Sequence, residues 1–187
     1  MQKVFEGEIL DTRVIVWNPA AVSLYDESGF GKPLPEENPT RLELELVESA
    51  FLVEKGRLRV YRTQNERKKF LSFGELLKIG SEKVSDFHPQ LTVYRDLRSR
   101  GYLVKTGFKF GAHFRVYERG VKLKRGPKAP HEHTRWVVHC VPEEAAFSLP
   151  EMSRAVRLAQ NIRSKFWWAV VDKEGDVTYY EVVRVTP

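Results

Sequence analysis

The hydrophobic pattern after Gly101 changes period several times, and this change constrains the fold more than any other feature of the sequence. Short apolar stretches typical of strands occupy Tyr102 to Lys105, Lys109 to Tyr117 and Trp136 to Val141. Gly101 is the kind of residue that ends a helix. We therefore expect three strands after Gly101, with a basic loop from Arg119 to Pro130 before the third.

Helical patterns flank these strands in the sequence. The earlier helix is indicated by an apolar stripe at helical spacing, formed by Phe87, Leu91, Tyr94 and Leu97. The later one begins at a possible capping box of Ser148 and Glu151, and its buried face comprises Met152, Ala155, Val156, Ala159 and Ile162. The run FWWAVV and the sequence VTYYEVVRV, joined by the turn DKEGD, predict a hairpin. The pattern predicts a mixed sheet with a helix on each side.

The first half of the chain has the pattern of a smaller α+β unit. Residues Val4 to Val16 predict two short strands around Asp11 and Thr12, and the run LELELVESAFLVEKG predicts a helix ended by Gly56. Ser72 with Glu75 indicates a capping box before a short helix. A shift of composition then suggests two domains, residues 1–82 and 83–187. The predicted sheet and helices of the second domain can be compared with an α/β domain of the restriction-endonuclease-like kind.

Composition narrows the class of protein. Lys and Arg outnumber Asp and Glu by 31 to 25, which gives a formal charge of +6 and a pI near 9.4 and favours a polyanionic partner. Cys140 is the only cysteine, so a disulfide or a multi-thiolate metal site within one chain is excluded. No apolar stretch approaches the roughly 20 residues of a membrane helix, and the start lacks a signal peptide's apolar region, so we expect a cytoplasmic protein.

Three side chains from separate elements could together cleave RNA without a metal: Tyr117, His133 and Lys165. Cleavage by the RNA's own 2'-hydroxyl needs a base, an acid for the departing 5'-oxygen, and a positive charge near the phosphorane. Histidine suits the acid, and lysine supplies charge at neutral pH. A phenol serves as base where cations lie nearby, and Arg115, Arg119 and Lys165 are the candidates for that role.

The motifs RGY, GFKFG, FRVY and AVVD-x-EGD-V-x-YY occur in this order along the chain, with His133-Thr134 between the third and the fourth. This series resembles the catalytic domain of archaeal tRNA-splicing endonucleases over about half of the chain. The earlier GKP and LELELVESAFLVEKG stretches resemble that family's N-terminal domain. The resemblance implies metal-independent cleavage of precursor tRNA at a bulge-helix-bulge, leaving a 2',3'-cyclic phosphate and a 5'-hydroxyl.

By this resemblance Tyr117 is the general base and His133 the general acid. The family's lysine usually follows an arginine directly, whereas here Arg163 is followed by Ser164 and only then by Lys165. An ungapped match therefore puts serine in the lysine's place. We assign the cation to Lys165, because a slip of one residue at a helix-to-strand junction could re-aim its long side chain. If Ser164 occupies the site, another cation or a partner subunit must act.

The resemblance also implies contacts outside the triad. Arg157 matches an arginine that clamps an extruded bulge base, and Arg184 is a candidate for its partner. The acidic turn of Asp172, Glu174 and Asp176 resembles the loop by which such subunits associate. The implied partners are precursor tRNA and either three identical chains or structural chains of similar fold, with no cofactor.

Other functions remain open on the sequence. The chain could be a non-catalytic subunit or an RNA-binding module of the same fold, which Ser164 favours. A magnesium-dependent nuclease would need an acidic cluster with a lysine, and the strands from Tyr102 to Tyr117 contain no acidic residue. His131 and His133 lack the further ligands of a zinc site. In the loop from Gly29 to Thr40, Lys32 or the neighbouring Arg41 could contact RNA.

Overall fold

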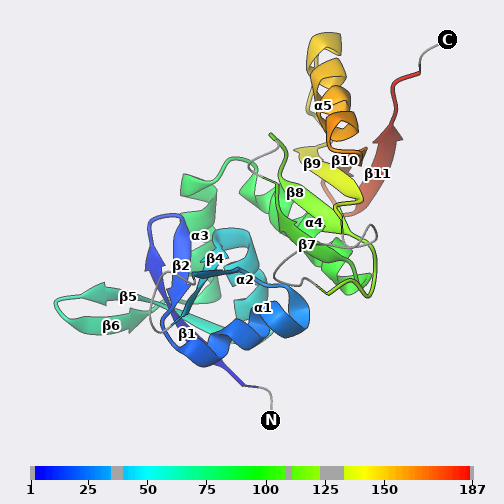
Figure 1. The fold of residues 1–187 in the computed structure, drawn as a ribbon. Coiled ribbons are helices and arrows are strands. Elements are labelled where there is room, and N and C mark those ends of the chain that lie inside the picture. The colour runs from blue at the N-terminus through cyan, green and yellow to red at the C-terminus, as the bar shows by residue number, and fades with distance from the viewer. Residues whose placement is uncertain (1–2, 35–39, 108–110, 123–132, 186–187) are drawn as a thin grey trace. The chain divides into compact units, whose positions relative to one another are not determined.

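The structure is a computed structural model, and it describes residues 3–34, 40–107, 111–122 and 133–185 (Figure 1). The chain divides into two compact units, residues 1–87 and 88–187. Each unit contains its own mixed sheet with helices, so the expected α+β class is confirmed.

The sheet of the first unit has six strands in the order β3-β4-β2-β1-β5-β6. Only the pairing of β1 with β5 is parallel. The strands are β1 (Phe5–Leu10), β2 (Arg13–Val16), β3 (Lys32–Leu34), β4 (Arg41–Glu45), β5 (Leu58–Gln64) and β6 (Arg67–Phe70). The two strands expected around Asp11 are confirmed, since Asp11 takes a left-handed conformation (φ 56°) between β1 and β2.

Three α-helices and a 3-10 turn complete this unit: η1 (Pro19–Ala21), α1 (Val22–Ser28), α2 (Leu46–Glu54) and α3 (Phe73–Lys83). The capping box of Ser72 and Glu75 at the start of α3 is confirmed. One prediction was partly wrong, because the run expected to be one helix begins as β4 and becomes helical only at Leu46. The alternation of Leu42 and Leu44 with charged residues has the period of a strand, and both leucines are fully buried.

The sheet of the second unit has five strands in the order β11-β10-β9-β8-β7. Its strands are β7 (Leu103–Thr106), β8 (Phe114–Tyr117), β9 (Trp136–Pro142), β10 (Lys165–Val171) and β11 (Val177–Val182). Only β9 and β10 pair in parallel, and the predicted hairpin of β10 and β11 is confirmed. β8 is shorter than expected, because residues 111–113 form a turn and bend, and Lys109 lies outside the described residues. Most of the expected basic loop, residues 123–130, also lies outside them.

Two helices pack on opposite faces of this sheet, α4 (Phe87–Ser99) and α5 (Leu149–Asn161). Phe114 contacts Tyr94 of α4 with ring centroids 5.5 Å apart, which defines the α4 face. Val137, Phe166 and Trp168 pack with Ala159 of α5, which defines the α5 face. Successive strand residues alternate between the two faces. Among the described residues, no helix is long and apolar enough to span a membrane.

Candidate active site

Tyr117 is the last residue of β8 and lies on the α5 face of the sheet. Arg115 pairs with Val137, which belongs to the α5 cluster, and Tyr117 follows Arg115 by two residues. The side chain of Tyr117 is only 1% exposed. Because this side chain is buried, RNA could reach its hydroxyl only after the groups that cover it have moved.

His133 lies three residues before β9, and its side chain is exposed. The carbonyl of the next residue, Thr134, accepts a hydrogen bond of 2.9 Å from the Ser164 hydroxyl. The backbone N–H of Arg135 in turn donates to the carbonyl of Val116, directly before Tyr117. These bonds join the segment of His133 to the end of β8 on one side and to Ser164 on the other.

The end of α5 decides where Ser164 and Lys165 point. Arg163 takes a left-handed conformation (φ 54°), and the N–H of Ser164 donates to the carbonyl of Ala159. This turn and this hydrogen bond end the helix, and β10 begins at Lys165. Ser164 is buried against Thr134, whereas Lys165 takes the first strand position.

Lys165 lies on the α4 face, opposite to Tyr117. Its neighbour Phe166 belongs to the α5 cluster, so Lys165 and Trp167 face the other way. Its ammonium forms an ion pair of 2.7 Å with Glu181, which also accepts a hydrogen bond from Trp167. The structure thus does not bring Lys165 together with Tyr117, and its assignment as the cation remains a prediction that this geometry does not favour.

Arg135 is a cation near Tyr117 that the sequence reasoning did not single out. Its N–H donates to the carbonyl of Val116, so it stands one residue off the register of β8 and β9, which ends at the pair of Val116 and Trp136. Its carbonyl accepts from the N–H of Lys165, so its backbone follows the ladder of β9 and β10. Its guanidinium lies 3.4 Å from Glu118, and both side chains are about half exposed. Its place in the sequence, between His133 and the start of β9, is the signal that could have identified it.

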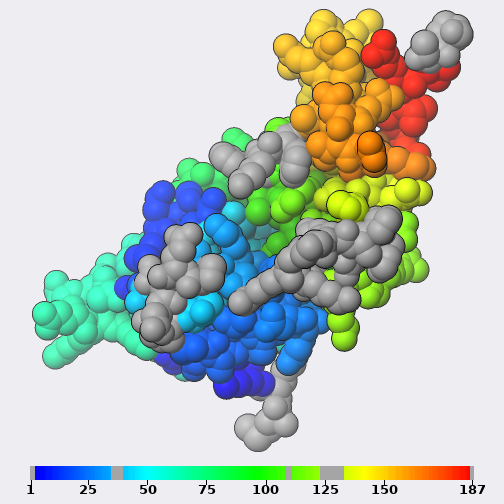
Figure 2. All heavy atoms as spheres, in the orientation of Figure 1, coloured from blue at the N-terminus to red at the C-terminus, as the bar shows by residue number. Residues whose placement is uncertain are grey.

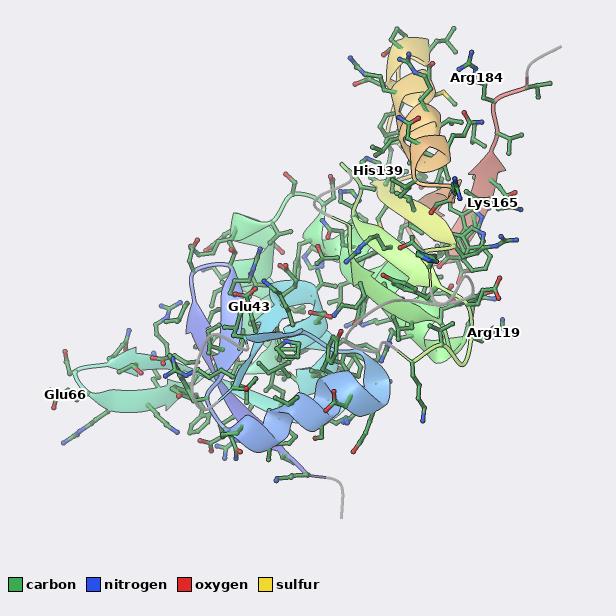
Figure 3. All side chains as sticks on the ribbon, in the orientation of Figure 1. Glu43, Glu66, Arg119, His139, Lys165 and Arg184 are labelled. Carbon is green, nitrogen blue, oxygen red and sulfur yellow. The ribbon has the colours of Figure 1, made fainter. Side chains whose placement is uncertain are left out.

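Of the three cations expected around Tyr117, only Arg115 shares its face of the sheet. The Arg115 guanidinium donates to the carbonyl of Thr106 at 2.9 Å. Arg119 instead lies over the ring of Tyr102, 4.9 Å from its centroid. Figure 3 labels Arg119 and Lys165.

The other residues assigned from the resemblance lie farther along the chain. Arg157 is exposed on α5, and Arg184 is exposed beyond β11, where Figure 3 labels it. Asp172, Glu174 and Asp176 form the turn between β10 and β11, where the Asp176 N–H donates to the Asp172 carboxylate at 2.8 Å. Lys173 in the same turn pairs with Glu144 at 3.2 Å.

Two histidines stack inside the α5 face. The rings of His113 and His139 lie 4.4 Å apart, and Nδ1 of His113 accepts from the N–H of Cys140. Burial, together with the neighbouring His139, lowers the pKa of His113 to about 4. These histidines therefore have a packing role. Within the described ranges, no group of three or more His, Cys, Asp or Glu side chains could hold a metal ion.

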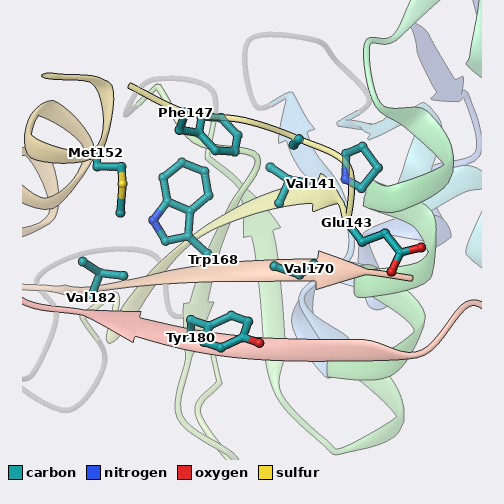
Figure 4. A pocket seen from close by; sticks show the side chains of 10 residues that line it. Val141, Glu143, Phe147, Met152, Trp168, Val170, Tyr180 and Val182 are labelled. Carbon is teal, nitrogen blue, oxygen red and sulfur yellow. The ribbon is translucent and has the colours of Figure 1, made fainter. Parts of the chain in front are cut away.

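A separate hollow of about 330 Å³ lies on the α5 face of β10 and β11 (Figure 4). Its lining includes Trp168, Phe147, Val141 and Met152, and Glu143 is the one charged residue among the described residues that line it. Tyr180, at its rim, is 56% exposed. A hollow this apolar suits the packing of another protein surface better than acid–base chemistry on RNA.

Comparison with known proteins covers both units. Residues 87–179 match the domain described as tRNA intron endonuclease, catalytic C-terminal domain, and residues 5–77 match its N-terminal domain. The chain is 39% identical to a tRNA-splicing endonuclease of Thermococcus onnurineus, with 97% of both chains covered. It is 39% identical over 181 residues to that of Methanococcoides burtonii and 38% identical to that of Methanosarcina mazei, but spans only 48% of the length of either. The chain belongs to the tRNA intron endonuclease family.

Proposed function

We propose that this chain is a tRNA-splicing endonuclease subunit that cuts precursor tRNA at bulge-helix-bulge junctions without a metal ion. The observation that carries the proposal is the backbone ladder that holds Tyr117 of β8 next to the segment of His133. The strand that ends in the phenol of Tyr117 is there hydrogen-bonded to the segment that carries the exposed imidazole of His133. The family matches over both units support the same activity.

The proposed reaction forms a bond from the 2'-oxygen to phosphorus and breaks the bond from phosphorus to the 5'-oxygen. Tyr117, as phenolate, takes the proton of the 2'-hydroxyl, and His133, as imidazolium, gives a proton to the departing 5'-oxygen. The products are a 2',3'-cyclic phosphate and a 5'-hydroxyl, so the reaction is that of a lyase. No oxidant and no water molecule is consumed.

The third component of the proposal is a positive charge beside the phosphorane. The sequence assigned it to Lys165, but the backbone favours Arg135, whose N–H is bound to the carbonyl of Val116, directly before Tyr117. To act, Arg135 would exchange its half-exposed pairing with Glu118 for the phosphate. A guanidinium suits this role because it can bind two phosphate oxygens at once.

A non-catalytic subunit is the second candidate, and one observation favours it. Ser164 stands between Arg163 and Lys165 where its hydroxyl is bound to Thr134, and the ammonium of Lys165 is paired on the opposite face. In that case the chain would bind RNA and a catalytic partner, and would not cut RNA alone.

The assembly is also a proposal. We propose a homotetramer or a tetramer with structural chains, in which the acidic turn of Asp172, Glu174 and Asp176 docks on another subunit. The edge strand β11 beside an apolar hollow, with Val183 61% exposed just beyond it, supports such a contact. Within that assembly Arg157 and Arg184 would bind the bulge of the RNA, with Arg157 stacking on an extruded base.

The test is cleavage of an intron-containing precursor tRNA by the purified chain in EDTA, with the chemistry of the product ends determined. Cyclic phosphate and 5'-hydroxyl ends are the expected result. Cleavage that returns only with added magnesium would contradict the proposed mechanism. Cleavage that appears only on addition of a second subunit would favour the non-catalytic role.

A further inference from the structure

The hairpin of β5 and β6 projects from the sheet of the first unit as a narrow arm (Figures 1 and 2). Its turn has only two residues, Asn65 and Glu66, both left-handed (φ 47° and 63°). Such a turn matches the twist of the strands and fixes their register. Figure 3 labels Glu66 at the tip.

The two faces of this hairpin differ in how their charges are paired. On the first face, Arg59 lies 3.7 Å and Lys68 2.8 Å from the carboxylate of Glu6. The same cations lie over aromatic rings, Arg59 over Phe70 and Lys68 over Tyr61. The cations of the first face are therefore already engaged within the protein.

The second face carries Arg62, Arg67 and Lys69, all of them exposed. The register places Arg62 directly opposite Lys69, and Arg67 two residues from Lys69 along β6. Among the described residues, none of the three forms a salt bridge. One carboxylate that senses them, Glu75, has its pKa lowered first by hydrogen bonds from Ser72 and, after these, by the charges of Lys69 and Arg62.

Two like charges placed directly across a pair of strands destabilise that pair. An anion bound across Arg62 and Lys69 would remove this cost, because it would neutralise both side chains at once. Among the described residues of this hairpin, the second face has no aromatic ring on which a base could stack, since Tyr61 and Phe70 lie on the first face. Its chemistry is thus that of contact with a phosphate backbone, independent of base sequence.

We propose that the face formed by Arg62, Arg67 and Lys69 binds the phosphate backbone of the RNA substrate. This inference rests on the proposed function, because it takes RNA as the substrate. It adds a binding surface in a different unit from the one that carries Tyr117 and His133. The surface contributes affinity and salt dependence and takes no part in the cleavage step.

The test compares two double variants that remove the same charge from opposite faces of the same hairpin. In Arg62→Gln with Lys69→Gln the second face loses two cations, and in Arg59→Gln with Lys68→Gln the first face does. The dissociation constant of precursor tRNA and of mature tRNA is measured against salt concentration in EDTA. Thermal unfolding of each variant and its single-turnover cleavage at saturating RNA are measured beside it.

The second-face variant should weaken binding of both RNAs about tenfold at moderate salt and lower the slope of log affinity against log salt by about 1 to 2. Its unfolding temperature should not fall, because a repulsive pair has been removed, and its cleavage rate at saturation should be unchanged. The first-face variant should change the salt slope by less than half as much and lower the unfolding temperature.

Equal slopes for the two variants would mean a general effect of net charge and would overturn the proposal. An unchanged salt slope with altered subunit association would make the face a protein contact, which also overturns it. Either result with normal cleavage would leave the proposed function intact, whereas a wild-type chain that neither binds nor cuts precursor tRNA would refute the function itself.

Discussion

Neighbouring residues of the same strands alternate between the two faces of the second sheet, and the two faces differ in the side-chain chemistry that they carry. On the α5 face, Tyr117 ends β8 beside the segment from His133 to Arg135, which is hydrogen-bonded to Val116 on one side and to Ser164 on the other. On the α4 face, Lys165 is paired with Glu181, next to the stacked rings of Trp136 and Trp167. The first face carries a phenol, buried as it stands, next to the segment of an exposed imidazole, whereas on the second the ammonium of Lys165 is engaged by Glu181.

The comparison shows that the face of the sheet on which a side chain lies matters more than its position in the sequence. Ser164 and Lys165 are adjacent, yet a shift of one residue moves a side chain to the other face of a sheet. A lysine on the α4 face would have to break its ion pair with Glu181 and pass round the end of the sheet to reach the phosphate. Arg135, whose backbone is bound to Val116, starts next to Tyr117.

The largest effect is expected at His133. His133→Ala should lower single-turnover cleavage by about 10²- to 10⁴-fold, because the departing 5'-oxygen loses its proton donor. Binding of precursor tRNA should change little. The matched control is His88→Ala, an exposed histidine in α4, which should leave the rate unchanged. Equal losses of binding and cleavage would make His133 a binding residue.

A smaller effect should separate the two candidate cations. Arg135→Gln should slow cleavage by about 10- to 100-fold, whereas Lys165→Gln should slow it less than about threefold. Ser164→Lys in the Arg135→Gln background should recover part of the rate, because it places an ammonium beside Thr134, in the segment of His133. A larger loss in Lys165→Gln than in Arg135→Gln would return the role to Lys165.

The smallest effect concerns stability on the α5 face. The pKa of His113 is about 4 in the folded chain, below the usual value near 6.5, so the folded state binds fewer protons than the unfolded one. The stability from neutral His113 is complete above about pH 6.5 and is lost as pH falls toward 4, to an extent on the order of 2–3 kcal/mol. His113→Gln should flatten this dependence in urea unfolding, and His88→Gln should not. An unchanged slope in His113→Gln would exclude the histidine pair as its cause.

Much of the fold was predictable because its signals are local. The capping boxes at Ser72 and Ser148, the hairpin around Gly175 and the helix that Gly56 follows each depend on a few adjacent residues, and each is confirmed. The hairpin of β5 and β6 was not predicted, since its turn, Asn65-Glu66, lacks the glycine that usually marks such turns.

The site was less predictable, because it depends on which face each strand presents. The sequence could name Tyr117 and His133 by motif, and their roles stay predictions. It could not decide between Ser164 and Lys165, because the left-handed turn at Arg163 that fixes the start of β10 has no glycine to signal it. Arg135 was missed because it became a candidate only through its backbone hydrogen bond to Val116, directly before Tyr117.

The central claim is that RNA is cut on the α5 face, and two tyrosines test it most directly. Tyr117 lies on that face, whereas Tyr179 of β11 donates a hydrogen bond of 2.8 Å to Asp96 of α4 on the other. Tyr117→Phe and Tyr179→Phe each remove one hydroxyl and keep the ring. Single-turnover cleavage of precursor tRNA in EDTA should fall by about 100-fold or more in Tyr117→Phe and stay near the wild-type rate in Tyr179→Phe. Full activity in Tyr117→Phe, or an equal loss in both, would contradict the account.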